Sequence, residues 1–314
     1  MTDRSENNAV SHAEIDPDTA GQRLDNFLLT RLKGVPRSHI YRLIRSGQVR
    51  VNSGRVKAHY RLQAGDRVRV PPVRRSSAPR IADANQGLAW LERCIIYEDE
   101  RLLVVDKPAG LAVHGGSGLA FGLIEGLRSL RPELKTLELV HRLDRDTSGC
   151  IMVAKRRSAL RQLHALMREG AVRKQYLALV QGQWQHGEIA VDAPLLVDRH
   201  GGGAKVRISP EGKPALSQFR LVSHYDRFAS LLEVEIPTGR THQIRVHAVA
   251  AGHPIAGDER YGDEVFNARC QELGLDRMFL HAQLIEFIWP ESDAEFIVSA
   301  PLPPELNAFL GALS

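Results

Sequence analysis

Apolar residues near the N-terminus recur every three or four positions, which is the spacing of one face of an α-helix. This spacing predicts a helix over residues 23–32, with inward positions at Leu24, Phe27, Leu28 and Leu32. A second, shorter helix is predicted to start at Ser38, whose hydroxyl can cap the first turn, and to end at Gly47. Residues 1–17 show no such pattern, and we predict that they form a disordered tail.

Beyond Gly47 the apolar residues alternate with polar ones, as they do in strands that are buried on one face. The alternating apolar positions are Val49, Val51, Val68 and Val70. Turns are predicted at residues 52–54 and 65–66, where Asn, Ser, Gly and Asp gather. Helices and strands together predict one small domain over residues 18–75, followed by a linker over residues 76–86, which offers few apolar side chains.

From residue 87 onward, short strand patterns outnumber helical ones. Strands are predicted at residues 95–97, 102–105, 151–154, 176–180, 231–236 and 279–287, and helices at residues 120–130, 158–169 and 241–251. Because strands and helices do not alternate one for one, the predicted fold class is α+β. We therefore expect residues 87–314 to form one body built on a largely antiparallel mixed β-sheet.

Composition sets broad limits on what the chain can be. With 314 residues and 43% hydrophobic content, it can form about two domains with a sizeable core. Its cysteines, Cys94, Cys150 and Cys270, lack the paired spacing of a zinc site or a disulfide framework. No apolar run approaches the roughly 18 residues of a membrane span. We therefore expect a globular, cytoplasmic protein that does not insert into a membrane.

Charge is distributed very unevenly along the chain. Residues 21–75 contain fourteen Lys and Arg but only two acids, a local net charge of +12, whereas the whole chain carries +5 and the remainder therefore −7. Such asymmetry is typical of a nucleic-acid-binding module joined to a body of different charge. The residues expected to face the nucleic acid, on the side away from the apolar positions, are Arg37, Arg42, Arg45, Arg50, Arg55 and Lys57.

The sequence HRLDRDTSG, residues 141–149, places Asp144 between two arginines in a turn that ends in glycine. Nearby guanidinium groups favour the ionised form of a carboxyl group. An ionised aspartate can act as a nucleophile or as a base at neutral pH. The alternative is a surface turn with solvated ion pairs, since structural ion pairs create the same charge environment.

A metal site is the main competing chemistry. Asp144 and Asp146 stand two residues apart near His141, and further histidines, His242 and His247, follow downstream. The interleaved arginines would repel a divalent cation, and the two downstream histidines are five residues apart rather than the four that suit one helical face. The glycine-rich run after His114 lacks the lysine and the hydroxyl residue of a phosphate-binding loop. We therefore expect neither a metal nor a nucleotide cofactor.

Three sequence blocks together resemble a known family. In order they are HRLDRDTSG at residues 141–149, KQYLALVQG at residues 174–182 and TGRTHQIRVH at residues 238–247, and they are similar to the three successive motifs of the RluA-type pseudouridine synthases. The stretch from GQRLDNFL through VRVNSGRVK to AGDRVRV resembles the S4 RNA-binding domain. The resemblance implies a small S4 domain ahead of a pseudouridine synthase catalytic domain.

The resemblance also implies roles for individual residues. Asp144 corresponds to the essential carboxylate, Arg245 to the arginine that pairs with it, and Tyr176 to the aromatic residue over the uracil. Arg142 corresponds to the residue that fills the space left by a flipped uridine, a task that suits a stacking guanidinium. From the residues alone, the alternatives are that Tyr176 is a core tyrosine of a strand and that Arg142 is an ion-pair partner of Asp144 or Asp146.

The implied reaction breaks the bond from uracil N1 to ribose C1′ and rejoins the base through C5, with no cofactor. Whether Asp144 attacks the sugar or removes a proton from it is left open. The implied partner is 23S ribosomal RNA, free or in an assembling large subunit, and we expect a monomer. Competing hypotheses are a non-catalytic RNA-binding protein, which could dispense with Asp144, and a metal-dependent nuclease, which a chelator would inhibit.

Overall fold

The structure, a computed structural model, describes residues 10–17, 19–32, 37–72, 88–115, 122–198 and 205–313, with the side chains of residues 37–39 left aside. The chain divides into two compact units, Met1–Asp83 and Ala84–Ser314, each with its own hydrophobic core. The predicted linker, residues 76–86, lies outside the described residues, as does Arg37 beyond its backbone. No described helix combines the length and the apolar character that a membrane crossing requires.

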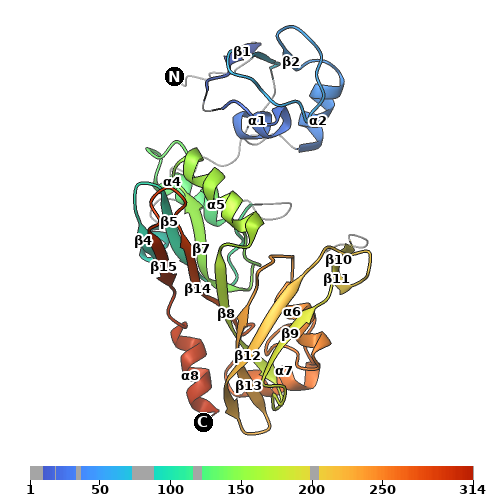
Figure 1. The fold of residues 1–314 in the computed structure, drawn as a ribbon, viewed down its shortest axis with the longest axis vertical. Helices are drawn as coiled ribbons and strands as arrows, with labels where there is room; N and C mark the ends of the chain where they lie inside the picture. The colour runs from blue at the N-terminus through green and yellow to red at the C-terminus, as the bar shows by residue number, and fades with distance from the viewer. Residues whose placement is uncertain are drawn as a thin grey trace, which may run out of the picture. The chain divides into compact units, whose positions relative to one another are not determined.

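The N-terminal unit packs two helices against a small antiparallel sheet with strand order β1-β3-β2 (Figure 1). Its elements are β1 Ser11–Glu14, α1 Leu24–Arg31, α2 Arg37–Arg45, β2 Arg50–Val51 and β3 Arg67–Val70. Both predicted helices are confirmed, and Gly47 follows the second with φ +72°, a backbone conformation that glycine adopts at little cost. The apolar residues that predicted these elements are buried together, from Leu24 to Val70.

The prediction of a disordered tail over residues 1–17 is wrong for its last part. Ser11–Glu14 form β1, whose partner is β3, and Ala13 and Ile15 are buried in the core of the unit. Two alternating apolar residues, Ala13 and Ile15, are too weak a local signal to predict a strand. The strand exists because β3, more than fifty residues later, supplies its hydrogen bonds, so the signal is non-local.

The second unit is built on a ten-stranded sheet with the order β4-β5-β7-β14-β8-β13-β12-β9, to which β15 adds by pairing with β14 and β6 by pairing with β7. Its strands are β4 Ile95–Glu98, β5 Leu102–Lys107, β6 Glu138–Leu139, β7 Ser148–Ala154, β8 Arg173–Gln181, β9 Glu188–Asp192, β12 Leu216–Tyr225, β13 Ala229–Glu235, β14 Leu280–Ile288 and β15 Glu295–Ser299. All pairs are antiparallel except β7 with β14. The predicted α+β fold with a largely antiparallel mixed sheet is confirmed.

Helices and a hairpin complete this unit. They are the 3-10 helix η2 Ala89–Cys94, the helices α4 Leu123–Leu130, α5 Arg157–Glu169, α6 Gln243–Ala250, α7 Glu264–Glu272 and α8 Pro304–Ala312, and the hairpin β10 Leu195–Asp198 with β11 Lys205–Ile208. The start of the helix predicted over residues 120–130 lies outside the described residues. Every predicted strand is present, whereas β6, β9 to β12 and β15 were not predicted.

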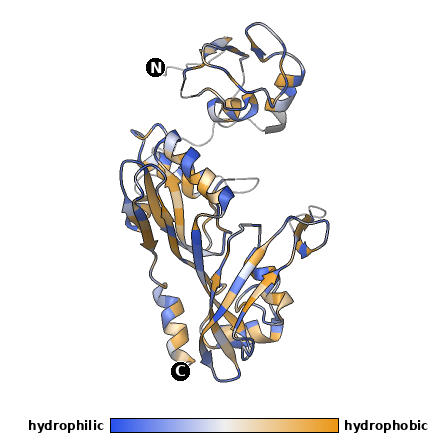
Figure 2. Cartoon of the chain, in the orientation of Figure 1, coloured by the Kyte–Doolittle hydropathy of each residue, from blue (hydrophilic) through white to orange (hydrophobic). Residues whose placement is uncertain are grey.

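Strand β7 lies at the centre of the packing and is buried on both faces. Met152 faces α5, where it joins Leu163 in one apolar cluster, and Val153 joins Leu127 of α4 in another. The apolar colour along β7 and its neighbours in Figure 2 follows this arrangement. A strand held by two cores is a rigid support, so the loop that enters β7 at its start, residues 140–147, has a fixed base.

Gly149 allows this base to form. It has φ +105°, and a Cβ atom at this position would lie 2.2 Å from the backbone oxygen of Ala282. The contact occurs where β7 runs parallel to β14, with Ser148 opposite His281. Only glycine permits this approach, so the last residue of HRLDRDTSG brings the motif against β14.

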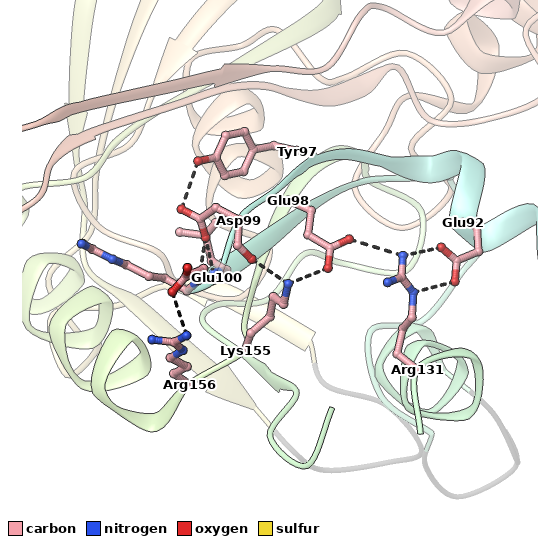
Figure 3. Close-up of polar contacts among 10 residues, drawn as sticks. Glu92, Tyr97, Glu98, Asp99, Glu100, Arg131, Lys155 and Arg156 are labelled. Carbon is pink, nitrogen blue, oxygen red and sulfur yellow. Dashed lines mark hydrogen bonds and ion pairs between the residues drawn. The ribbon is translucent and has the colours of Figure 1, made fainter. Parts of the chain in front are cut away.

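An ion-pair network ties the edge of the sheet to the end of α4 (Figure 3). Arg131 contacts Glu92 at 2.7 Å and Glu98 at 3.3 Å, and Lys155 contacts Glu98 at 2.6 Å. Lys155 also donates to the carbonyl oxygen of Asp99 at 2.6 Å. Single partly exposed pairs contribute little free energy, but this set connects η2, β4, α4 and the end of β7, and it thereby supports the fold of this unit.

Candidate active site

The loop before β7 carries Asp144 and is clamped to the body through its main chain. The N–H of Thr147 donates to the carbonyl oxygen of Asp144 at 3.3 Å, which closes the turn. The carbonyl oxygen of Arg145 accepts hydrogen bonds from the N–H of Gly110 at 2.8 Å and from Nζ of Lys107 at 3.0 Å. Lys107 is fully buried, and burial lowers its pKa to about 7. Hydrogen bonds from Gly110 and Lys107 therefore fix the main chain of the turn at Arg145.

His141, the first residue of the motif, has a structural contact. Its Nε2 accepts a hydrogen bond from the N–H of Met152 at 3.1 Å. Burial lowers the pKa of His141 to about 3, so the ring is neutral at physiological pH and can accept at this nitrogen. The residue that we weighed as a metal ligand beside the two aspartates is thus engaged with the β7 backbone.

Asp144 lies at a small cavity of about 70 Å³. Its side chain is 18% exposed, and its Oδ2 is 3.5 Å from Nη1 of Arg245 and 3.9 Å from Nε2 of His242. The cavity is lined by side chains from the loop, from β8, from the segment before α6 and from α6 itself, among them Arg142, Asp144, Tyr176, Arg240, His242 and Arg245. The structure therefore brings together all four residues that the resemblance singled out in the second unit.

Arg245 is oriented by a second carboxylate, Asp258. Its Nε and Nη2 each donate to Asp258 at 2.7 Å, in bidentate geometry, which leaves Nη1 directed at Asp144. Burial alone would lower the pKa of Arg245, but the hydrogen bonds and charge of Asp258, together with Asp144, raise it overall. The guanidinium also lies 5.0 Å from the ring centre of Tyr261. Arg245 is thus a fixed positive charge beside Asp144.

Asp258 is held as firmly as the arginine it binds. It is 1% exposed, and its Oδ1 accepts from the N–H groups of Arg260 at 2.9 Å and Tyr261 at 3.1 Å. These bonds and the Arg245 pair overcome the effect of burial and keep the pKa of Asp258 below its usual value. We did not predict Asp258 from the sequence. A signal was present, because it is a charged residue directly after the apolar run PIAG.

His242 occupies a strained backbone position at the start of α6. It is not glycine, yet its φ is +54°, a conformation that usually costs about 1 kcal/mol or more. Its Nδ1 lies 2.8 Å from the hydroxyl of Tyr261, which also accepts the N–H of Val206 at 2.9 Å. Burial lowers the pKa of His242, so the ring is neutral near pH 7 and adds no full charge at Asp144.

Tyr176 and Arg142 lie on different parts of the cavity wall. Tyr176 belongs to β8, where Val234 and Ala282 flank it on the neighbouring strands, and it is 7% exposed. Burial, together with the charge of Asp144, raises its pKa, so its hydroxyl stays protonated. Arg142 is exposed at the rim, and among the described residues no carboxylate forms an ion pair with it. It is therefore available to a ligand.

Other residues of the third motif fix the segment that leads into α6. Oε1 of Gln243 accepts from Oγ1 of Thr238 at 2.8 Å and from the N–H of Arg240 at 3.0 Å, and its Nε2 donates to the carbonyl oxygen of Leu216 at 2.8 Å. His247 lies fully buried with Nδ1 2.9 Å from Oγ of Ser217. These polar residues fix the segment from which His242 and Arg245 reach the cavity.

The six basic residues predicted to bind RNA come from several elements of the N-terminal unit. Arg42 and Arg45 lie on α2, Arg50 on β2, and Arg55 and Lys57 in the segment that follows, all five exposed. The side chain of Arg37 lies outside the described residues. The basic character of this unit is thus spread over the helix and the sheet.

Comparison with known proteins identifies the family. Residues 101–250 match the RNA pseudouridylate synthase family model, and residues 22–68 match the S4 domain model. The chain is 54% identical over 98% of its length to "Ribosomal large subunit pseudouridine synthase C" of Pasteurella multocida, covering 95% of that protein. The protein of the same name from Escherichia coli K12 is 51% identical, with 99% and 98% covered. This chain belongs to the RNA pseudouridylate synthase family.

The fold of this pseudouridine synthase also has solved relatives. "Human RNA Pseudouridylate Synthase Domain Containing 4" matches with a TM-score of 0.62 and 26% identity over 74% of this chain and 97% of that one. The predicted resemblance is thus confirmed, both for the catalytic family and for the S4 domain. The chain is an RNA pseudouridine synthase, and Asp144, Tyr176 and Arg245 lie within the part matched by the family model.

Proposed function

We propose that this enzyme converts uridine to pseudouridine at specific positions of 23S ribosomal RNA, with Asp144 as its essential carboxylate and without a cofactor. The observation that carries the proposal is the cavity in which Asp144 faces the fixed guanidinium of Arg245 beside the ring of Tyr176. The names of the relatives, which cover nearly the whole chain, support a large-subunit RNA as the substrate.

The chemistry needs one ionised oxygen at the sugar and a way to hold the base. The N1–C1′ bond breaks, the uracil turns, C5 bonds to C1′, and the proton at C5 leaves while N1 gains one. No electrons are exchanged with an outside group. Asp144 can serve by attacking C1′ or by removing a proton from the sugar, and in both routes the guanidinium of Arg245 lies 3.5 Å from its Oδ2.

Positioning is assigned to the residues around Asp144. Asp258 holds the fork of Arg245, so that Nη1 is presented to Asp144 without a search through rotamers. Tyr176 provides an aromatic wall for the uracil, and its protonated hydroxyl can donate or accept one hydrogen bond near the base. Arg142, at the rim, enters the space left by the extruded uridine.

Recognition of the wider RNA is assigned to the S4 domain, which we place at residues 18–75, ahead of a linker at 76–86 and the catalytic domain at 87–314. Its net charge of +12 between residues 21 and 75 suits phosphate contacts. We also propose that the enzyme acts in the cytoplasm as a monomer, on free 23S RNA or on an assembling large subunit.

Mapping pseudouridines in the 23S RNA of a strain that lacks this protein tests the proposal. We expect specific uridines to remain unmodified in the deletion strain, and to be modified again when the wild-type chain is expressed but not when Asp144→Asn is. Retention of every 23S pseudouridine in the deletion strain, or loss of sites only in transfer RNA, would reject the proposed substrate.

Arg142→Ala should slow the reaction mainly where the target uridine is paired. A base in a helix must be unstacked at a cost of a few kcal/mol, whereas an unpaired base has little stacking to lose, so we expect roughly a thirtyfold loss on paired RNA and less than about threefold on unpaired RNA. Single-turnover rates at saturating enzyme, on two RNAs that differ only in the pairing of the target, provide the measurement.

Two further variants sharpen this comparison. Arg142→Lys should rescue poorly, because lysine supplies charge without a planar group that stacks. Arg145→Ala is the matched control, since Arg145 is an exposed arginine in the same loop whose Nε contacts Asp146 at 3.0 Å, and it should affect both RNAs little. An equal loss on paired and unpaired RNA for Arg142→Ala would show that Arg142 acts on the chemistry and not on base extraction.

A further inference from the structure

The N-terminal unit holds a second cavity, far larger than the one at Asp144, and we propose that it binds a phosphodiester group of the RNA backbone. The cavity measures about 500 Å³ on the outer face of the three-stranded sheet. It is lined by His12, Gly47, Gln48, Arg50, Asn52, Ser53, Arg67 and Arg69, and we call it the sheet pocket. This inference rests on the proposed RNA substrate and assigns a site that the motifs of the catalytic unit do not include.

The strand register gathers the charges of the sheet pocket. Arg69 on β3 lies opposite His12 on β1 and opposite Arg50 on β2, so these three residues form one row across the sheet. Val68 and Val70 alternate with the arginines of β3 and are buried in the core, which turns Arg67 and Arg69 to the outer face. Residues separated by more than fifty positions in the sequence thus share one surface.

Two arginines opposite each other in this row are costly without a counter-ion. Cationic side chains directly opposite each other on paired strands destabilise a sheet, and Arg50 and Arg69 have this relation. The lining of the sheet pocket includes no carboxylate. Glu14 lies opposite Arg67 in the strand register. Within the described part of the chain, however, no carboxylate forms an ion pair with Arg50, Arg67 or Arg69. An anion in the pocket would remove this repulsion.

Main-chain oxygens orient two of the guanidinium groups without neutralising them. Arg69 donates from Nη1 to the carbonyl oxygen of Gln48 at 2.6 Å. Arg50 donates from Nε to the carbonyl oxygen of Gly47 at 3.2 Å and from Nη1 to that of Ser53 at 3.3 Å. Each guanidinium has five N–H donors, so both keep donors for a ligand. Guanidinium forks match the oxygens of a phosphate group in bidentate fashion.

The sheet pocket differs from the surface expected for RNA on the basis of the sequence. Of the six basic residues predicted there, only Arg50 lines the pocket, and Arg67 and Arg69 were not among them. Arg42 and Arg45 lie instead on α2. The unit therefore offers basic residues on the helix in addition to those of the sheet pocket.

Salt-dependent RNA binding by the full-length protein tests the sheet pocket. The test variant is Arg67→Gln/Arg69→Gln, and the matched control is Arg31→Gln/Arg61→Gln, which removes two exposed charges from the same unit outside the pocket. The dissociation constant of a 23S RNA fragment is measured across a series of salt concentrations. Losing one phosphate contact should lower the slope of log Kd against log salt by about one and raise Kd at low salt about tenfold or more.

The control variant should change the slope by less than half as much as the pocket variant. Equal changes in both variants would overturn the proposal, since they would mean that only the total charge of the unit matters. Thermal unfolding of both variants checks that the unit stays folded. Chemical shifts measured on adding inorganic phosphate at constant ionic strength show whether the pocket binds free phosphate. If the pocket responded to phosphate while the pocket variant kept the wild-type salt slope for RNA, the proposal that it binds the RNA backbone would also be overturned.

Single-turnover pseudouridine formation at saturating enzyme separates this inference from the proposed function. Both double variants should match the wild-type rate once the RNA is bound, because neither changes a residue of the cavity at Asp144. If the wild type itself formed no pseudouridine in the 23S fragment, the proposed function would be rejected while the comparison of salt slopes would still be readable.

Discussion

Asp144→Asn is expected to lower the single-turnover rate of pseudouridine formation by roughly a thousandfold or more, which is the scale of losing a nucleophile or base. The amide keeps the shape of the side chain but loses the charged oxygen that faces Arg245 at 3.5 Å. RNA affinity and the midpoint of thermal unfolding should change little, since this pair is longer than a hydrogen bond and the side chain is partly exposed. Tritium release from C5-labelled uridine in RNA gives the rate.

The same loop supplies the control for this experiment. Asp146→Asn makes the identical chemical change two residues away, at an aspartate whose contact is the exposed guanidinium of Arg145. We expect its rate to stay within about threefold of wild type, because a surface pair contributes at most about 1 kcal/mol. A rate for Asp144→Asn within tenfold of wild type, or an equal loss in both variants, would withdraw the catalytic assignment of Asp144.

Asp258→Asn should lower kcat by about a hundredfold while KM for the RNA changes little. The substitution removes the charge that holds the fork of Arg245, so the guanidinium is no longer fixed toward Asp144, and misplacement of about 1 Å near the reacting atoms costs on this order. Stability should also fall, by about 3 kcal/mol, because the buried cation loses its partner. Rates measured well below the midpoint of thermal unfolding separate the two effects.

A double-mutant cycle with Arg245→Met distinguishes positioning from a general structural role. If Asp258 acts only through Arg245, adding Asp258→Asn to Arg245→Met should cost little further rate, since groups that work as a unit are not additive. The control is Glu305→Gln, which breaks another arginine pair, that of Arg277 at 3.1 Å, but with an exposed carboxylate. Additive losses in the cycle would mean that Asp258 affects the reaction by another route.

Local signals account for the features that were predicted correctly. Helices α1, α2 and α5 follow from apolar spacing along one segment, and the strands β5, β7 and β8 follow from short apolar runs. Such patterns reflect the burial of neighbouring positions on one element, so they can be recognised without knowing the partner. Two of the strands not predicted, β1 and β9, are short and mostly exposed, and they form because a neighbouring strand pairs with them.

The candidate site also combines features that local sequence indicates with features that depend on contacts between distant segments. The amino-acid sequence was enough to propose the loop as a candidate site, since Asp144 between arginines and the glycine at position 149 lie within nine residues, and its three motifs indicated the family. Three features became visible only in the folded chain: Nη1 of Arg245 lies 3.5 Å from Asp144, Asp258 orients that arginine, and Arg50 and Arg69 share a pocket with His12. These contacts join separate elements. Their distances depend on sheet register and core packing, which involve the whole chain and leave no local pattern at the residues themselves.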